Sequence, residues 1–199
     1  MAEVEERTRR IVETAIELAE KDGFEAVRLR DVARLAKVAL GTVYRRFRSK
    51  EDILVAALEH EVNRFLSQPL EGFEGQSPEE RVSHAFAIMT SWFCSKPNFA
   101  RACLRAAASG VPEVSEKVTR FHDLMIQGLV AVMAGGKPMN HAKEQHYQFL
   151  AHALQNNWFA ELVGWAGGLH TEKEIIDRMT RISAFLLEAP IPSRSENVA

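Results

Sequence analysis

Residues 29–47 read LRDVARLAKVALGTVYRRF, and this stretch decides the fold of the N-terminal part of the chain. Apolar residues recur there at helical spacing in two short segments, about 29–36 and 39–47, with Lys37 and Val38 between them. Two short helices joined by so tight a turn are typical of a helix-turn-helix. We therefore expect the second helix to enter a groove of DNA.

The second segment divides into two faces when successive residues are placed 100° apart. The apolar face holds Leu40, Val43, Tyr44 and Phe47, and the polar face holds Gly41, Thr42, Arg45 and Arg46. Arg45 suits bidentate recognition of guanine, Thr42 suits a base or a phosphate, and Arg46 suits a phosphate. Gly41 has no side chain to keep the helix backbone away from a groove.

The charge of this region also favours nucleic acid. Residues 23–50 contain eight Lys and Arg against two Asp and Glu, a net charge of +6 in a chain whose overall charge is −2. One-signed blocks of this kind are typical of proteins that bind a polyanion. Ser49 is expected to cap a further helix, which places Lys50 beside free backbone N–H groups that favour a phosphate.

The rest of the chain is expected to be helical as well, with about nine helices in all. A polar stretch after Ser67 indicates a linker, and residues 191–199 are expected to form a disordered tail. No run of 18 apolar residues occurs and the start MAEVEERTRR is charged, so we expect a cytoplasmic protein that contacts no membrane. Cys94 and Cys103 are interpreted as buried thiols, with a redox switch as the alternative.

Residues 11–54 resemble the DNA-binding head of the tetracycline-repressor (TetR) family of transcriptional regulators. The matching residues are Gly23-Phe24-Glu25-Ala26, Arg30-Asp31-Val32-Ala33, Gly41-Thr42-Val43-Tyr44, Phe47 and Ser49-Lys50. The resemblance implies that bases are faced by Leu40, Gly41, Thr42 and Arg45. It implies that phosphates are held by Tyr44, Arg46 and Lys50. For Leu40 this disagrees with the apolar face, so the choice between core and groove stays open.

Four residues depart from the usual pattern of that family. Arg28 and Ala39 stand where Ser or Thr often caps the second and third helices, Lys37 stands where the turn often has glycine, and Leu40 stands where a polar residue is common. A lost cap costs about 1 kcal/mol. Arg28 and Lys37 would offset the loss by contacting phosphates, which completes the set expected to bind DNA.

For the remaining residues the resemblance covers layout only. It implies a DNA-binding domain over 1–50 and a ligand-binding and dimerisation domain over 51–190. The homodimer would form through the last two helices, which carry more apolar surface than one core needs. The residues expected at that interface are Leu154, Trp158, Leu162, Trp165, Ile175, Met179, Ile182 and Phe185.

The same layout implies a pocket for a small molecule among the fifth to eighth helices. The expected lining residues are Phe86, Met89, Trp92, Phe93, Phe99, Cys103, Phe121 and Met125. Few charges fall in this region, so the effector is expected to be apolar or aromatic, steroid-like or lipid-derived. The spacing from Asn156 to Trp165 is loosely similar to regulators of sterol catabolism. Filling the core is the alternative role of these side chains.

The sequence therefore predicts a ligand-responsive regulator, most often a repressor, that binds a palindromic operator as a homodimer and needs no cofactor. Its alternatives are a helix-turn-helix regulator without small-molecule control and a helical enzyme. The enzyme is disfavoured because His141, His146 and His152 do not share a helix face and no catalytic motif occurs. A cavity of some hundreds of Å³ would favour ligand control, and a region filled by side chains would favour the first alternative.

Overall fold

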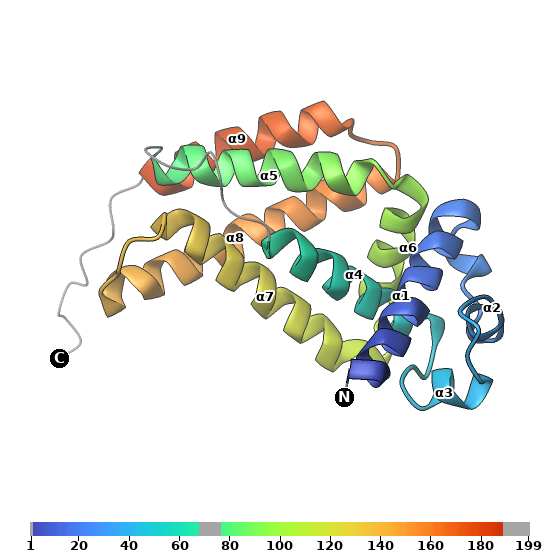
Figure 1. Ribbon diagram of the computed structural model, residues 1–199. Coiled ribbons are helices and arrows are strands. Elements are labelled where there is room, and N and C mark those ends of the chain that lie inside the picture. The colour runs from blue at the N-terminus through green and yellow to red at the C-terminus, as the bar shows by residue number, and fades with distance from the viewer. Residues whose placement is uncertain (1, 68–76, 189–199) are drawn as a thin grey trace.

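The computed structural model describes residues 2–67 and 77–188. Within these ranges the chain forms nine α-helices and two 3-10 helices (Figure 1). The α-helices are α1 Ala2–Asp22, α2 Leu29–Leu35, α3 Leu40–Tyr44, α4 Lys50–Leu66, α5 Pro78–Cys94, α6 Pro97–Ala107, α7 Ser115–Ala134, α8 His141–Ala166 and α9 Glu172–Glu188. The 3-10 helices are η1 Phe24–Ala26 and η2 Pro112–Val114. The predicted all-α class is confirmed, whereas the predicted linker after Ser67 and the tail over 191–199 lie outside the described residues.

Several helix boundaries are defined by caps, and the cap predicted at Ser49 is one of them. The backbone N–H of Asp52 donates a hydrogen bond to Oγ of Ser49 at the start of α4, over 3.1 Å. Ser77 and Glu80 form a reciprocal capping box at the start of α5. After α7, Gly135 adopts a φ of 58°, a left-handed conformation that glycine tolerates best, and the helix ends there.

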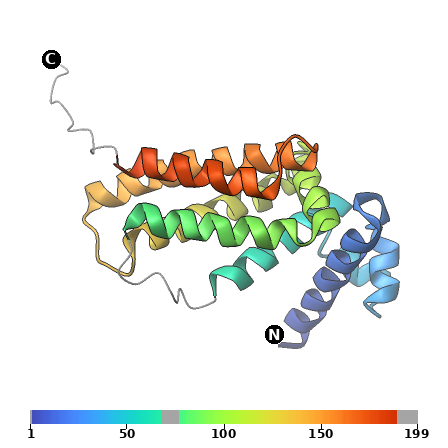
Figure 2. The ribbon, with the colours of Figure 1, turned by 90° about the horizontal axis from the view of Figure 1, so that it is seen from above.

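The helices separate into a small end and a larger bundle. α1, α2 and α3 gather at one end, and α5, α7, α8 and α9 form the bundle (Figures 1 and 2). α5 and α9 lie side by side in both views, and α8 packs against α7 and α9. Both α4 and α6 pack against α1. These two helices therefore join the small end to the bundle.

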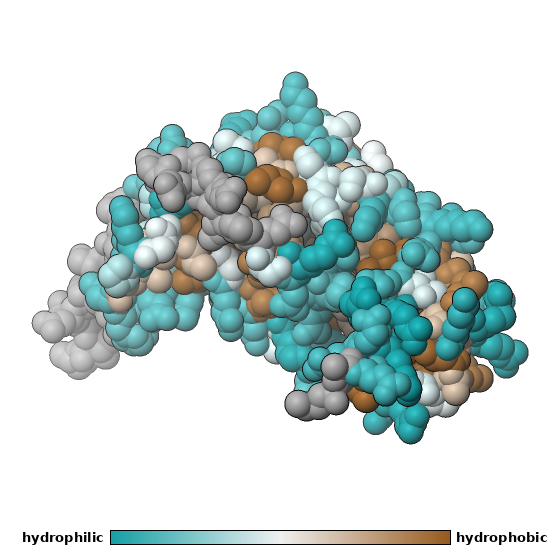
Figure 3. All heavy atoms as spheres, viewed as in Figure 1, coloured by the Kyte–Doolittle hydropathy of each residue, from teal (hydrophilic) through white to brown (hydrophobic). Residues whose placement is uncertain are grey.

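The buried side chains follow the predicted apolar stripes. Ile11 and Ala15 of α1 and Val32 of α2 are fully buried, and so are Phe86 of α5 and Leu154 of α8. Hydrophilic residues dominate the surface over the small end, with separate hydrophobic patches between them (Figure 3). Among the described residues, no helix is both long and apolar enough to cross a membrane.

Both cysteines are protonated at neutral pH. Cys94 is half-buried rather than fully buried as predicted, and its partial burial raises the pKa of its thiol to about 11. Cys103 is fully buried, and burial raises the pKa of its thiol well above the usual value. Because the thiolate is the reactive form, the structural interpretation of these residues is favoured over a redox switch.

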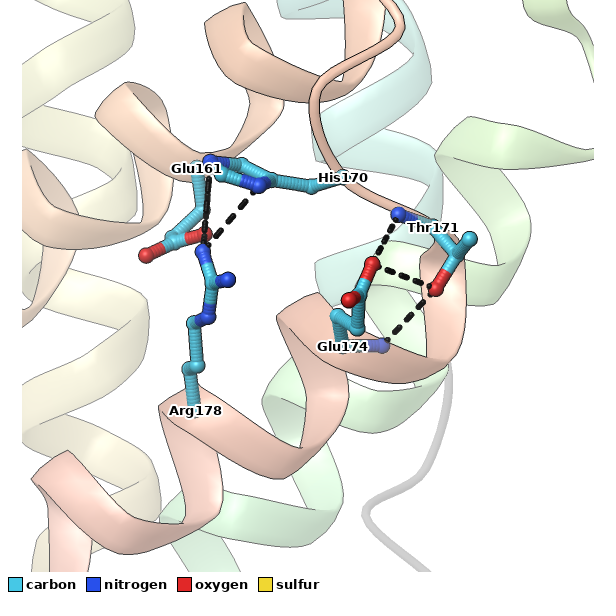
Figure 4. A network of polar contacts seen from close by, with 5 residues as sticks. All are labelled: Glu161, His170, Thr171, Glu174 and Arg178. Atoms are coloured by element: carbon cyan, nitrogen blue, oxygen red, sulfur yellow. Dashed lines mark hydrogen bonds and ion pairs between the residues drawn. The ribbon is translucent and has the colours of Figure 1, made fainter.

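A polar network joins the end of α8 to the start of α9 (Figure 4). Nη1 of Arg178 donates a hydrogen bond to Oε2 of Glu161 over 2.8 Å and lies 3.1 Å from Nδ1 of His170. The backbone N–H of Thr171 donates to Oε2 of Glu174 over 2.8 Å, and the N–H of Glu174 donates back to Oγ1 of Thr171 over 3.3 Å. This reciprocal cap begins α9, and the hydrogen bond from Arg178 to Glu161 ties α9 to α8.

Candidate nucleic-acid interface and ligand cavity

The turn between α2 and α3 is a Schellman motif. The backbone N–H of Val38 donates to the carbonyl of Ala33 over 3.0 Å, and Lys37 between them has a φ of 55°. This is the left-handed region, which a residue with a Cβ enters at a cost of about 1 kcal/mol. The geometry explains why glycine is common at this position in the resembled family. In this chain Lys37 occupies the position in place of glycine. It adopts the strained conformation and adds an exposed positive charge.

Helix α3 is shorter than predicted, and it exposes two residues that its apolar face had assigned to the core. Val43 and Phe47 are buried, as expected, but Leu40 is 36% exposed and Tyr44 is 54% exposed. Leu40 and Tyr44 therefore lie outside the core, although helical periodicity alone places both on the apolar face. Val43 and Phe47 already fill the space beneath the five-residue helix, and Leu40 lies at its first position.

The polar side chains of this region point away from the core. Arg45 and Arg46 are exposed, and Thr42 is half-buried. Nη2 of Arg45 lies 3.4 Å from Oγ1 of Thr42, so the two groups predicted to contact bases are neighbours. A Cβ built on Gly41 would meet nothing within 4 Å. Gly41 thus leaves the outer side of the helix open to a close approach.

Three of the five predicted phosphate contacts gather beside the start of α2, whereas Lys37 and Arg46 lie elsewhere. An open hollow of about 470 Å³ is lined there by Val27, Arg28, Leu29, Arg30, Asp31, Tyr44 and Lys50. The structure thereby brings together Arg28, Tyr44 and Lys50, which come from three separate parts of the sequence. Neither Arg28 nor Ala39 makes a side-chain capping bond, as their positions in the sequence indicated.

Lys50 has a partner that the sequence reasoning did not find. Its Nζ lies 2.5 Å from Oε2 of Glu25 and 4.2 Å from the centroid of the Phe24 ring. The hydrogen bond from Lys50 is the main reason why the pKa of the Glu25 carboxyl is lowered. Gly23-Phe24-Glu25-Ala26 belongs to the matching residues, but nothing in the spacing of 25 residues indicates that this pair meets.

The corner that follows α3 is held from inside the molecule. The buried carboxylate of Asp52 accepts a hydrogen bond from the backbone N–H of Arg48 over 2.9 Å and forms an ion pair with Lys117 of α7. Nζ of Lys117 also lies 4.8 Å from the centroid of the Phe47 ring. A shift of α7 would therefore directly displace the corner that follows α3.

A cavity of about 30 Å³ lies within the bundle, enclosed by α4 to α8. Five of the eight predicted lining residues contribute to its wall, namely Met89, Trp92, Phe93, Phe121 and Met125. The other wall residues are Leu58, Val62, Phe65, Leu104, Ala107, Gln155, Trp158, Phe159 and Leu162. The contribution of α4 was missed because its apolar residues look like ordinary core residues in the sequence.

Phe86, Phe99 and Cys103 lie outside this wall, so their assignment to the pocket is corrected. Phe86 is fully buried and its ring centroid lies 5.8 Å from that of Trp158. Phe99 is buried at the contact between α6 and α1, where its backbone N–H donates to Oε2 of Glu20 over 3.0 Å. Sγ of Cys103 lies 3.6 Å from the carbonyl oxygen of Leu54. All three fill the core.

The cavity is smaller than the hundreds of Å³ that would favour ligand control. About 30 Å³ holds little more than one water molecule, whereas ligand pockets occupy about 300–1,000 Å³. Any effector larger than this has to displace wall side chains. Met89 and Met125 are unbranched and adapt to such changes more readily than the aromatic residues beside them.

The predicted dimer interface needs a larger correction. Leu154, Trp158, Leu162, Ile175 and Met179 are buried within the protomer itself, so they are unavailable to a second chain. Trp165 and Ile182 are half-buried against the same core, and Phe185 is 77% exposed. The outer face of α8 instead carries Phe149, Ala153, Ala160 and Val163, which are separated by four, seven and three residues and so lie on one side of the helix.

No group of three or more His, Cys, Asp or Glu residues with the arrangement of a metal site occurs in the described parts of the chain. His141 is exposed and its Nε2 lies 3.0 Å from Nε2 of Gln145. The histidines singled out in the sequence are therefore not assembled by the fold.

The chain matches the family profile of bacterial regulatory proteins of the tetR family over residues 11–57. It matches the profile of tetracyclin repressor-like C-terminal domains over residues 75–186, which is more than half of the chain.

Among curated proteins, it is 29% identical over 182 residues to the HTH-type transcriptional repressor KstR of Rhodococcus jostii, covering 92% of this chain and 83% of KstR. Two solved structures share the fold. A TetR transcriptional regulator from Rhodococcus sp. RHA1 superposes with a TM-score of 0.82 at 22% identity, over 94% of this chain and 98% of that chain. Thermus thermophilus FadR in complex with lauroyl-CoA superposes with a TM-score of 0.63 at 20% identity, over 96% of this chain and 99% of that chain.

Proposed function

The chain belongs to the tetR family of bacterial regulatory proteins, and we propose that it is a repressor whose homodimer binds a palindromic operator and responds to an apolar small molecule. The assignment to a family of transcriptional regulators agrees with the prediction that the chain is not an enzyme. In this proposal residues 1–50 bind DNA, and residues 51–190 bind the effector and form the dimer.

The observation that carries the proposal is that one side of α3 is buried while the opposite side is largely exposed. Val43 and Phe47 anchor the helix, which leaves Leu40, Thr42 and Arg45 free to meet base edges. Arginine pairs with guanine through two hydrogen bonds, and the exposed leucine suits contact with a thymine methyl group. Phosphate contacts are assigned to Arg28, Lys37, Tyr44, Arg46 and Lys50.

The dimer is proposed to form through the outer face of α8, together with the exposed end of α9. Phe149 is 70% exposed, Val163 is 47% exposed and Phe185 is 77% exposed. Large apolar side chains that remain exposed on two neighbouring helices suit a surface that another chain covers. A two-fold axis along this face would give the two α3 helices the symmetry of a palindromic operator.

The effector is proposed to enter the cavity between α4 and α8 by displacing the wall side chains. The apolar wall suits an acyl chain or a steroid nucleus, and the relative from Thermus thermophilus binds lauroyl-CoA in its crystal structure. Helix α4 carries Leu58 and Val62 in the wall and begins at Lys50 beside the DNA-binding residues. A displaced α4 would change the separation of the two recognition helices and weaken operator binding.

A second candidate function is a tetR-family regulator without small-molecule control. The cavity of about 30 Å³ favours it, because the wall side chains already fill most of the space. The two candidates share the DNA-binding role and differ only in the response to an apolar ligand.

The DNA-binding role is tested by selecting fragments of genomic DNA with the protein and measuring the affinity of two variants for the selected operator and for random DNA. Arg45→Ala is expected to weaken operator binding and to relax sequence preference, whereas Lys50→Ala is expected to weaken binding to both DNAs alike. An equal loss on operator and random DNA for Arg45→Ala would remove its assignment as a base reader.

Ligand control is tested by titrating the protein–operator complex with lauroyl-CoA and with cholesterol. Release by either probe supports the first candidate and identifies the class, and no release by either supports the second. Ala107→Phe places a large side chain in the cavity and is expected to abolish the response. Ala108→Phe alters the exposed residue that directly follows the same helix and is expected to preserve the response.

A further inference from the structure

The phosphate-binding lysine proposed above shares its carboxylate partner with an arginine from the bundle. Lys50 Nζ lies 2.5 Å from Oε2 of Glu25, and Nη2 of Arg105 lies 3.0 Å from Oε1 of the same carboxylate. Both cations also lie against the ring of Phe24, at 4.2 Å for Lys50 and 4.0 Å for Arg105 from the centroid. One turn of 3-10 helix, η1, therefore holds Lys50 on one side and α6 on the other.

Arg105 belongs to a helix that also contacts the cavity. Leu104 and Ala107 of α6 form part of the cavity wall, while Arg105 between them points outward to Glu25. The beginning of α6 is bonded to α1 through Glu20, whose carbonyl oxygen accepts a hydrogen bond from Nδ2 of Asn98 over 2.9 Å. A displaced cavity wall would thus move Arg105 relative to η1.

A carboxylate and a DNA phosphate compete for the same ammonium group. While Glu25 holds Lys50, part of the positive charge of Lys50 is neutralised internally, and the carboxylate itself repels an approaching phosphate. Arg105 opposes both effects because it neutralises the same carboxylate. The affinity for DNA then depends on how Glu25 is shared between the two cations.

We propose that Glu25 is a positioning residue that limits the availability of Lys50 to DNA phosphate, and that Arg105 of α6 relieves this limit. The inference rests on the proposed role of Lys50 in DNA binding. The side chains of Glu25 and Arg105 are 66% and 59% exposed, so their ion pair contributes little to folding. Substitutions here therefore report on DNA binding rather than on folding.

The test measures the affinity of the full-length protein for its selected operator and for random DNA over a series of salt concentrations. Glu25→Gln is expected to tighten binding to both DNAs by about two- to fivefold, the range typical of one exposed ion pair. The plot of log affinity against log salt is expected to steepen by up to about 0.9, the contribution of one more phosphate contact. Glu13→Gln removes an equal charge from a carboxylate that is paired with Arg9, and it serves as the control.

Arg105→Gln provides the second half of the test. It is expected to weaken binding by about two- to fivefold in the wild-type background and to have no effect in the Glu25→Gln background. A loss that persists in the Glu25→Gln background would overturn the proposal, because Arg105 would then contact DNA itself. A Glu25→Gln variant that binds no more tightly than Glu13→Gln would also overturn it.

Lys50→Ala separates this inference from the proposed function. If Lys50→Ala binds DNA as tightly as the wild type, the role of Lys50 in the proposed function fails and this inference fails with it. If Lys50→Ala weakens binding while Glu25→Gln matches Glu13→Gln, the role of Lys50 stands and only this inference is overturned.

Discussion

The recognition surface and the cavity are built from residues under different constraints. At α3 and directly after it, the arginines proposed to meet DNA have no packing role, since Arg45 and Arg46 are exposed and the core beneath is filled by Val43 and Phe47. In the cavity wall every side chain except those of Ala107 and Gln155 also belongs to the surrounding core or packs against it. A residue that only binds DNA can be recognised in the sequence from its side-chain chemistry. A residue that both fills the core and lines a cavity can be recognised only from its position in the structure.

The largest expected effect separates a core residue from an exposed residue on the same helix. Phe86 was assigned to the pocket but is fully buried outside it, so Phe86→Ala is expected to lower the free energy of unfolding by about 3–5 kcal/mol. Ile88→Ala on the same helix, where the side chain is 39% exposed, is the control and should change it by about 0.5 kcal/mol. Urea denaturation measures both. A loss below about 1 kcal/mol for Phe86→Ala would contradict its placement in the core.

The next effect concerns the outer face of α8. Phe149→Glu places a charge on the surface proposed to pair with a second chain, and it is expected to weaken the dimer by about 2 kcal/mol or more. Leu169→Glu alters an equally exposed apolar residue in the loop between α8 and α9 and is expected to leave the dimer intact. Sedimentation equilibrium measures the two dissociation constants. Equal dimer dissociation constants for the two variants would show that Phe149 does not lie in the interface.

Assignments made from the sequence were accurate for the exposed residues at α3 and inaccurate for many of the buried apolar residues. Gly41, Thr42 and Arg45 could be placed on an outer face because a charged or polar residue beside buried Val43 has no alternative inside a small head. Leu154, Ile175 and Met179 were assigned to a dimer interface because they are as apolar as residues that a partner would cover. Helical periodicity finds a stripe but does not say whether the chain itself or another chain covers it.

Helical periodicity also could not predict the contacts between segments that are distant in the sequence, for a different reason. The meetings of Glu25 with Lys50 and of Asp52 with Lys117 depend on how η1, α4 and α7 are arranged in space. Local spacing determines which residues share one helix face, but it contains no information on which face of another helix lies opposite. The caps at Ser49 and Ser77 were predictable because their partners lie three residues away.

A smaller effect is expected at the recognition helix itself. Ala39 precedes α3 in an extended conformation and provides no side-chain cap, so Ala39→Ser is expected to stabilise the protein by about 1 kcal/mol. Ala142→Ser introduces the same hydroxyl inside the first turn of α8, where Asn140 already provides the cap, and should give no stabilisation. Thermal unfolding compares the two variants. If Ala39→Ser is no more stable than Ala142→Ser, the missing cap at Ala39 does not destabilise α3.

The smallest expected effect is a pH dependence beside the cavity. Burial lowers the pKa of His122 from its usual 6.5, and the hydrogen bond with Gln155 of the cavity wall opposes that shift only in part. As the pH falls, the unfolded chain therefore binds the proton first. The stability that neutral His122 contributes is complete above about pH 6.5 and is lost as the pH falls through the lower pKa of the folded protein.

Urea denaturation between pH 7.5 and about pH 5 should accordingly show a steeper loss of stability for the wild type than for His122→Gln. His141→Gln, which alters an exposed residue at the start of α8, should retain the steeper loss. Parallel curves for the wild type and His122→Gln would mean that the imidazole is as well solvated as in the unfolded chain. The wall would then be open to water at this point, and His122 would resemble the exposed side chains of α3 rather than the buried ones of the bundle.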